Sequence, residues 1–218
     1  MFLAGAAAAT LLSAADTAQR LTSSAEVFQE IMQVADKSIP QKLLDKSECV
    51  IVVPGMKKGA IFVGGKYGRG FVSCRKDGGG WGPPAAIRIE GGSFGLQLGG
   101  SETDVVMLVM NARGVERLTR SKFTLGGDAS VAAGPVGRQA SADTDLMMTA
   151  EILTWSRSRG VFAGISLQGA TLRPDRKVNE ELYKQAWGTK EIVKSGLETP
   201  PQAAELVRLL NKYSARKT

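Results

Sequence analysis

Apolar residues near the start of the chain recur at helical spacing. This pattern predicts an amphipathic helix that is capped by Ser23 or Ser24 and runs to about Lys37. A second short helix is expected from Pro40 to about Ser47, because proline is tolerated in the first turn of a helix. The apolar face of the first helix is expected to consist of Ala25, Phe28, Ile31, Met32 and Ala35.

From residue 49 the pattern changes to short β-branched or aromatic runs that are separated by glycine and proline, which is typical of an antiparallel meander. Pro54 with Gly55, and Gly64 with Gly65, are the expected turns. The run 105–110 is continuously apolar, which predicts a central strand with both faces covered. The expected strands in this part are 49–53, 60–63, 70–74, 85–89, 93–98 and 104–110.

The second half of the chain continues with one short helix and further strands, and then returns to helices. A helix is expected from Asn111 through Leu118, followed by strands at 123–125, 129–133, 150–155 and 161–167 and a polar turn at 140–145. Two further helices are expected at 174–187 and 200–213. Helices, then strands, then helices predict an α+β fold: an antiparallel β-sheet, open or barrel-like, flanked by N-terminal and C-terminal helices. The expected division is a single domain at 16–195, with a C-terminal helix and basic tail at 196–218.

Residues 1–15 are predicted to be the remnant of a secretory signal peptide. Phe2 to Leu12 are almost unbrokenly apolar and Ser13-Ala14-Ala15 resembles a cleavage site, although the usual basic start is missing. The alternative is a buried N-terminal helix, since alanine favours helices. Export predicts a periplasmic or secreted protein that associates peripherally with membranes. In such a compartment Cys49 and Cys74 would form a disulfide, and two buried thiols remain the alternative.

Composition restricts the chemistry that this chain can perform. Its 218 residues include no histidine, which excludes Ser-His-Asp, Cys-His and histidine-metal mechanisms within the chain. Gly91, Ser93 and Gly95 match a nucleophile elbow, but no base is available to activate the serine. The acidic residues Asp128, Asp143 and Asp145 fit no EF-hand spacing. We therefore expect no enzyme activity, cofactor or metal.

Charge is the more informative property, because Lys plus Arg number 28 against 21 Asp plus Glu, a net charge of +7. No acidic residue occurs between Glu48 and Asp77, so basic side chains at strand ends and turns are expected to form a rim that attracts anionic lipid headgroups. The alternative is that these basic side chains are ordinary solvated surface charges that bind no ligand. The residues of this expected rim are Lys57, Lys58, Lys66, Arg69, Arg75 and Lys76.

Two further charged positions carry expectations. The glycines of Gly134-Pro135-Val136-Gly137-Arg138 favour either an anion-binding nest in which Arg138 clamps a phosphate, or a plain hairpin turn. Glu151 lies in an apolar run, and a buried carboxylate requires a cationic partner, for which Arg157 or Arg159 is expected.

An ordered series of motifs resembles the SYLF domain family, also called the Ysc84-type actin-binding domain family, over about residues 25–190. The resemblance is to the bacterial exported type and implies a lipid-binding module, since eukaryotic members bind phosphoinositides and other acidic phospholipids and some bind actin. This chain shows no attached Src-homology or FYVE module. The matching motifs are VIVVP (50–54), KGA (58–60), GGKYGRG (64–70), WGPP (81–84), GSFGLQLG (92–99), GGD (126–128), GPVGR (134–138) and SRSRGVFAG (156–164).

The expected function is non-catalytic binding of anionic phospholipid at a membrane surface, with Phe28, Ile31 and Met32 available for interfacial insertion. The alternative is a protein-interaction module or periplasmic scaffold without a lipid ligand. We expect no nucleic-acid partner, because stacking platforms are not evident, and actin is not expected in a bacterial setting. The expected lipid-binding residues are Lys57, Lys58, Lys66, Arg69, Arg75 and Arg138.

Overall fold

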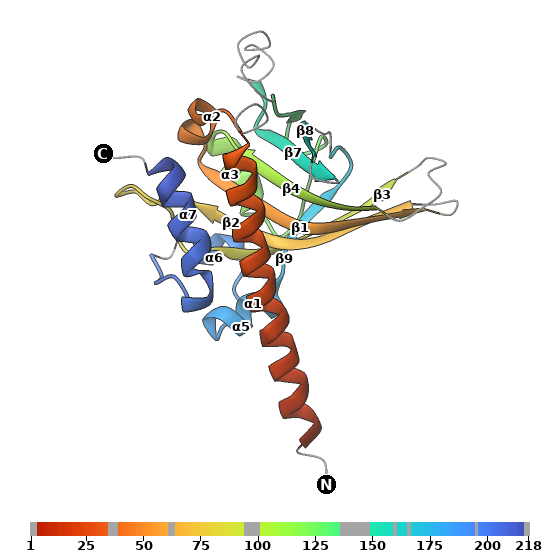
Figure 1. Cartoon of the computed structure of the whole chain (residues 1–218), viewed down its shortest axis with the longest axis vertical. Helices are drawn as coiled ribbons and strands as arrows, with labels where there is room; N and C mark the ends of the chain where they lie inside the picture. The colour runs from red at the N-terminus through yellow and green to blue at the C-terminus, as the bar shows by residue number, and fades with distance from the viewer. Residues whose placement is uncertain are drawn as a thin grey trace.

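The computed structural model describes residues 4–34, 39–60, 64–93, 101–135, 149–158, 161–164, 167–194 and 196–215 (Figure 1). Its helices are α1 (Ala4–Gln33), α2 (Gln41–Lys46), α3 (Ala112–Leu118), α5 (Arg176–Tyr183), α6 (Thr189–Lys194) and α7 (Ala204–Ser214), the last preceded by a 3-10 turn, η2 (Pro201–Ala203). Its strands are β1 (Cys49–Ala60), β2 (Gly64–Cys74), β3 (Ala85–Ser93), β4 (Ser101–Val109), β5 (Phe123–Thr124), β6 (Val131–Ala133), β7 (Ile152–Ser158), β8 (Val161–Gly164) and β9 (Thr171–Pro174).

The described strands form one sheet in the order β5-β9-β3-β2-β1-β4-β7-β6, and β8 pairs with β7. The two end strands, β5 and β6, are consecutive in the chain and are joined by a tight turn in which the Gly126 amide donates to the Ala129 carbonyl oxygen. This connection draws the two sheet edges toward each other, so the sheet curls into a half-barrel. The predicted α+β fold is confirmed, with one difference: β6 and β7 pair in parallel, so the sheet is mixed.

The sheet is covered on both faces, as the apolar run in β4 predicted. Val105 to Val109 are all buried, and alternate residues pack into different cores. Val106 and Leu108 belong to the core on the outer face, beneath α1, α2 and α7, whereas Met107 belongs to the core inside the curl of the sheet. This alternation follows from the two-residue period of a strand.

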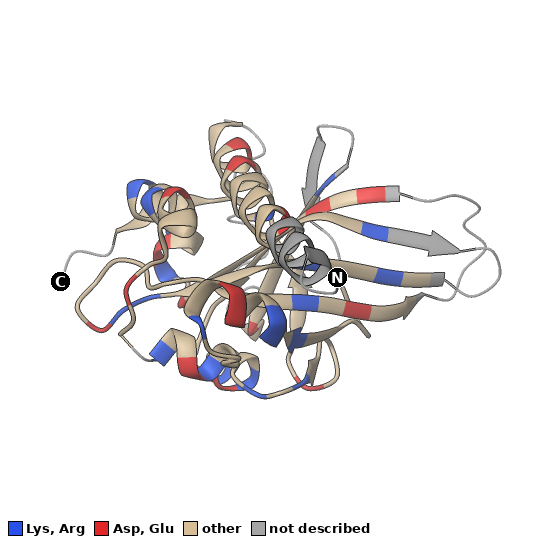
Figure 2. Cartoon of the chain, turned by 90° about the horizontal axis from the view of Figure 1, so that it is seen from below, with Lys and Arg blue, Asp and Glu red and all other residues tan. Residues whose placement is uncertain are grey.

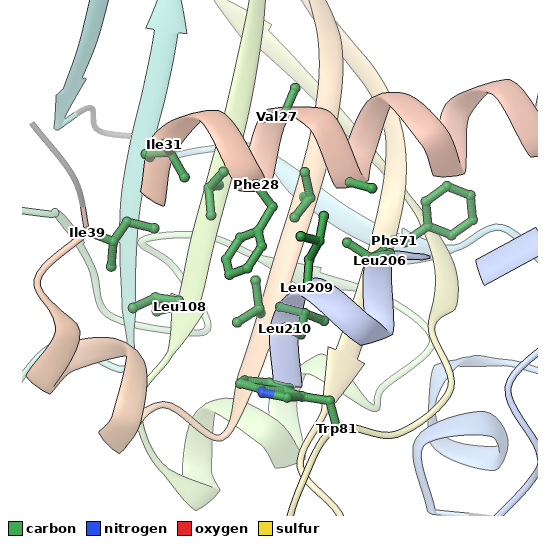
Figure 3. Close-up of a cluster of buried hydrophobic side chains, with 14 of the residues drawn as sticks. Val27, Phe28, Ile31, Ile39, Phe71, Trp81, Leu108, Leu206, Leu209 and Leu210 are labelled. Carbon is green, nitrogen blue, oxygen red and sulfur yellow. The ribbon is translucent and has the colours of Figure 1, made fainter. Parts of the chain in front are cut away.

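Helix α1 holds the outer core together (Figure 3). Phe28 and Ile31 are 0% exposed and belong to the same buried cluster as Leu209 and Leu210 of α7. Phe28 points from α1 toward the sheet. Membrane insertion of Phe28 and Ile31 is therefore a wrong prediction, because both side chains are core residues. Met32 is partly buried against the same cluster.

The start of α1 also differs from the prediction. The helix passes through Ser23 and Ser24 without a break, and the Ser24 hydroxyl donates to the Arg20 carbonyl oxygen one turn earlier instead of capping a terminus. Residues 4–15 have helical backbone, and their origin as a signal remnant stays a prediction. Among the residues that the structure describes, no helix combines the length and apolarity needed to cross a bilayer.

An irregularity in β1 replaces the turn expected at Pro54 and Gly55. The register of β1 with β2 shifts between Val52 and Lys57, so one extra β1 residue is accommodated and the strand continues to Ala60. A bulge of this kind changes which face the following side chains occupy. It places Lys57 opposite Tyr67, on the outer face of the sheet.

Cys49 and Cys74 are direct partners in the β1–β2 register and form a disulfide. The alternative of two buried thiols is thereby resolved in favour of the bridge. The bond links the first residue of β1 to the last residue of β2, next to the segment on which α2 and α7 pack.

Candidate functional site

A groove of about 810 Å³ lies between α1 and the outer face of the sheet. One wall is the polar side of α1, and the other consists of β1, β2, β4 and β7. Charged side chains of both signs line it, with acidic residues on both walls. The charged lining residues are Asp16, Arg20, Glu26, Glu30, Lys57, Arg69, Glu102, Asp104 and Arg157.

One end of this groove is held by Arg157 of β7. Its guanidinium lies 2.6 Å from Asp104, its register partner on β4, and also contacts Glu30 of α1. Asp104 accepts a further hydrogen bond of 2.9 Å from the Gly55 amide, which the β1 bulge presents. Burial raises the pKa of Asp104 from its ordinary value, and the nearby Glu102 carboxylate adds to this effect. These groups fasten α1 to the sheet.

At the other end of the groove, Arg69 of β2 connects the sheet to neighbouring elements. Its Nε donates to Asp175 at 2.7 Å, and its guanidinium lies 3.7 Å from Asp16 of α1. Burial alone would lower the pKa of Arg69. The hydrogen bond to Asp175 and the charge of its carboxylate outweigh this effect, and Tyr67 and Asp16 add smaller contributions, so the pKa of Arg69 is raised overall. Arg69 is therefore a permanent cation with one firm internal partner.

The predicted basic rim is divided between the two faces of the β1–β2 hairpin. Lys57 lies on the outer face, opposite Tyr67 on β2 and Glu102 on β4. Lys66 follows the alternation of β2 and occupies the opposite face, with Lys58 as its register partner. The side chain of Lys58 and all of Arg138 lie outside the described residues.

Arg75, at the far end of β2, has a role within the fold. Its guanidinium donates to the carbonyl oxygens of Ser47, Leu44 and Ser214 and to the Ser214 hydroxyl, at 2.6 to 3.0 Å. It also stacks 4.2 Å from the centroid of the Trp81 ring. These contacts join α2 and α7 to the sheet, so we leave Arg75 out of the candidate site.

Two arginines that the sequence did not single out lie beside Arg69. The register pairs Arg69 with Arg88 of β3, and Arg88 with Arg173 of β9, so the three form a row across adjacent strands. We call these residues the arginine row. Only the alternation of Arg88 between Ile87 and Ile89 was visible in the sequence, because β9 was not recognised as a strand.

A second concavity, of about 770 Å³, lies between α3 and the β5–β6 turn. Glu151 is buried there, and its Oε2 accepts from the Ser130 amide at 3.0 Å and lies 3.2 Å from Nε of Arg117. The predicted burial with a cationic partner is confirmed, and the partner in the structure is Arg117. Of the two expected partners, Arg157 does not fill this role and Arg159 lies outside the described residues. Arg157 is instead directed to Asp104 by the register of β4 with β7. In the part of the chain that the structure describes, no cluster of acidic and cysteine side chains could hold a metal ion.

Comparison with known proteins gives consistent matches to one family. Residues 90–213 match the family described as Ysc84, Las17-binding protein actin regulator. The chain is 32% identical over 199 residues to the SH3 domain-containing YSC84-like protein 1 of Rattus norvegicus, a match that covers 88% of this chain and 58% of that protein. It is 31% identical over 179 residues to Protein YSC84 of Saccharomyces cerevisiae, covering 81% of this chain and 38% of that protein.

The chain thus spans about three fifths or less of the length of these relatives. The rat relative is named as an SH3 domain-containing protein, and the family is described as an actin regulator. The family model covers more than half of the chain, and the resemblance that the motifs indicated is confirmed: the chain belongs to the Ysc84 (SYLF) family.

Proposed function

We propose that the chain is a non-catalytic module that binds anionic phospholipid with the end of the β1–β2 hairpin. One observation carries this proposal: Lys58 and Lys66 are direct cross-strand partners, and Lys57 is the adjacent residue. Like charges directly opposite each other destabilise a strand pair unless an anion lies between them. We call Lys57, Lys58 and Lys66 the hairpin lysines.

The surroundings of the hairpin lysines support contact with a membrane surface. Tyr67, the register partner of Lys57, is 49% exposed, and tyrosine suits an interface because its ring is apolar and its hydroxyl polar. The strands that carry these residues extend beyond α1, and Figure 2 shows Lys and Arg along them. Each basic residue near an anionic surface contributes about 1 kcal/mol, so the three lysines together would strengthen binding about a hundredfold.

The test is co-sedimentation with phosphatidylcholine vesicles that contain or lack phosphatidylserine, at low and high salt. Charge reversal of the three hairpin lysines to Glu is expected to abolish binding to the anionic vesicles. The matched control reverses the exposed lysines of α5 and α6, Lys177, Lys190 and Lys194, and is expected to keep at least part of that binding. Equal binding by both variants, or no binding by the original chain, would refute the proposal.

A second candidate function is binding of a protein segment in the groove beside α1. The mixed charge of the groove and the family's description as an actin regulator favour it. Co-sedimentation with actin filaments tests it directly. Ser23→Arg with Glu26→Arg narrows the groove on its α1 wall, and these changes are expected to remove filament binding while vesicle binding persists. Filament binding that survives them would locate the contact elsewhere.

We further propose that the chain works in an oxidising compartment, as an exported protein. The disulfide between Cys49 and Cys74 supports this, because such bonds persist in exported proteins and are rare in the cytosol. The test is alkylation of free thiols in the protein purified from the organism that produces it. Modification of both cysteines without prior reduction would refute it.

A further inference from the structure

The concavity between α3 and the β5–β6 turn differs from the groove beside α1 in position and in charge. Its volume of about 770 Å³ suits a small molecule, and it shares no described lining residue with the groove. Its charged lining residues balance each other, because Arg113 and Arg117 face two acidic residues, Asp128 and Glu151. A concavity with balanced charge does not favour a ligand with a large net charge.

Close packing of α3 against the residue that precedes β7 brings these charges together. A Cβ atom at Gly114 would lie 2.7 Å from Cγ1 of Val109 and 3.1 Å from the Glu151 carbonyl oxygen, and glycine avoids both contacts. Arg113 and Arg117 are four residues apart on α3, which places them on the same face of the helix. Both therefore line the concavity together with the buried Glu151.

Two of the four charged groups are used by the fold. Oδ2 of Asp128 accepts a hydrogen bond of 2.7 Å from a backbone amide of its own turn. Nε of Arg117 lies 3.2 Å from Oε2 of Glu151, the same oxygen that accepts from the Ser130 amide. Oε1 of Glu151 accepts no hydrogen bond from a described residue, and the exposed guanidinium of Arg113 has no acidic partner among them.

The remaining two groups add nothing to the stability of the fold. A buried carboxylate is costly unless both of its oxygens are hydrogen-bonded, and Glu151 uses only one. Arg113 adds a second cation four residues before Arg117, and like charges at this spacing destabilise a helix. The concavity therefore holds one unused acceptor and one unused cation.

We propose that this concavity binds a small zwitterion with a free ammonium group and a free carboxylate, which is an amino acid or a short peptide. The ammonium group would donate to Oε1 of Glu151, and the carboxylate would accept from Arg113, because guanidinium groups bind carboxylates bidentately. The site goes beyond the proposed function, since it uses none of the hairpin lysines and takes a ligand without net charge. Four lining residues with small side chains leave room for the ligand: Ala112, Gly126, Gly127 and Ala129.

Calorimetric titration of the chain with L-alanine, dialanine and trialanine tests the proposal, because this series increases the distance between ammonium and carboxylate in steps. At least one of the three is expected to bind. Its N-acetylated and its C-terminally amidated derivatives each lose one charge, and each is expected to bind at least about tenfold more weakly. No binding by the three probes, or equal binding by either derivative, would overturn the proposal. Tighter binding of glycerophosphoethanolamine would also overturn it, because the site would then suit a lipid headgroup.

Variants of the chain locate the binding. Arg113→Gln is expected to weaken binding of the best probe at least about tenfold, without a change in thermal unfolding or vesicle binding, because Arg113 is exposed. The matched control is Arg120→Gln, which removes an exposed arginine that follows α3, pairs with Glu116 and lies outside the concavity. This control is expected to bind the probe as the original chain does. Equal binding by the two variants would overturn the site.

Glu151→Gln tests the ammonium end of the site. The amide keeps an acceptor oxygen for the Ser130 amide but removes the negative charge, so probe binding is expected to fall at least about tenfold. The N-acetylated probe, which lacks the ammonium group, is expected to bind this variant and the original chain equally. Undiminished binding of the zwitterion by Glu151→Gln would overturn the assignment. Thermal unfolding shows whether this variant folds, and Arg113→Gln decides the proposal if it does not.

Discussion

Replacement of Gly70 by alanine tests how closely β1 and β2 approach each other at the bulge. A Cβ atom at Gly70 would lie 2.1 Å from the Val52 carbonyl oxygen and 2.8 Å from the Val53 Cα. Both are backbone atoms of β1, so they cannot move aside as a flexible side chain would. Overpacking of this kind costs about 1–3 kcal/mol, and the backbone contact places Gly70→Ala at the upper end of that range.

Gly92→Ala on β3 is the matched control. No atom lies within 4 Å of the position its Cβ would occupy, and Gly92 is exposed. Alanine there is expected to stabilise the chain by about 0.4–1 kcal/mol, because it reduces the conformational entropy of the unfolded state. The two variants should therefore differ by about 3–4 kcal/mol in free energy of unfolding.

Urea denaturation followed by fluorescence of the three tryptophans measures this difference. At about 2–4 °C per kcal/mol for a chain of this size, the midpoint of thermal unfolding of Gly70→Ala should fall at least about 6 °C below that of Gly92→Ala. Equal midpoints would show that the strands do not meet at Gly70 as described. The bulge, and with it the position of Lys57 on the outer face, would then have to be reconsidered.

Three further predictions concern contacts that hold the fold together. Arg75→Ala should lower the free energy of unfolding by about 3–5 kcal/mol in urea denaturation, because buried acceptors lose their charged donor, and Arg75→Lys should recover only part of it. Reduction of Cys49–Cys74 should cost about 3.5 kcal/mol for a separation of 25 residues, measured by thermal unfolding with and without reductant. Burial raises the pKa of Tyr183, whose hydroxyl donates to the Pro84 carbonyl oxygen, so stability should decline as pH rises above about 10, where only the unfolded tyrosine ionises. Tyr183→Phe should be less stable at neutral pH and lack this alkaline decline; an unchanged decline would refute the assignment.

Local patterns in the sequence predicted those features that depend on neighbouring residues. The buried strand at β4 and the short helix that starts at Asn111 are both confirmed, since these signals act within a few positions of the chain. The dipeptide Pro54-Gly55 led to a wrong prediction of a turn, because this pair is typical of turns. In the structure it forms a bulge, and the segments on either side of it stay paired with the neighbouring strands. Only long-range pairing distinguishes these two cases.

The candidate site depends on such long-range pairing. Arg88 and Arg173 are far apart in the chain, and only the β3–β9 register makes them neighbours. The same limitation applies to the ion pair of Glu151. The apolar run around Glu151 predicted its burial, but its partner, Arg117, comes from α3, and the sequence alone did not identify it. Counting charges along the sequence located the region of the hairpin lysines but could not show that they divide between two faces.

The basic residues of this chain fall into two groups with opposite expected behaviour. Arg75 and Arg157 are engaged by several acceptors and connect helices to the sheet, so their removal should weaken the fold. Arg88 and Arg173 repel each other and share one carboxylate, so removing their charge should leave the fold at least as stable. Thermal unfolding of Arg75→Ala and of the double variant Arg88→Gln with Arg173→Gln should therefore give opposite results for the two groups. If the double variant instead unfolded several degrees earlier than the original chain, the arginine row would contribute to the stability of the sheet, and the argument from like-charge repulsion would be refuted.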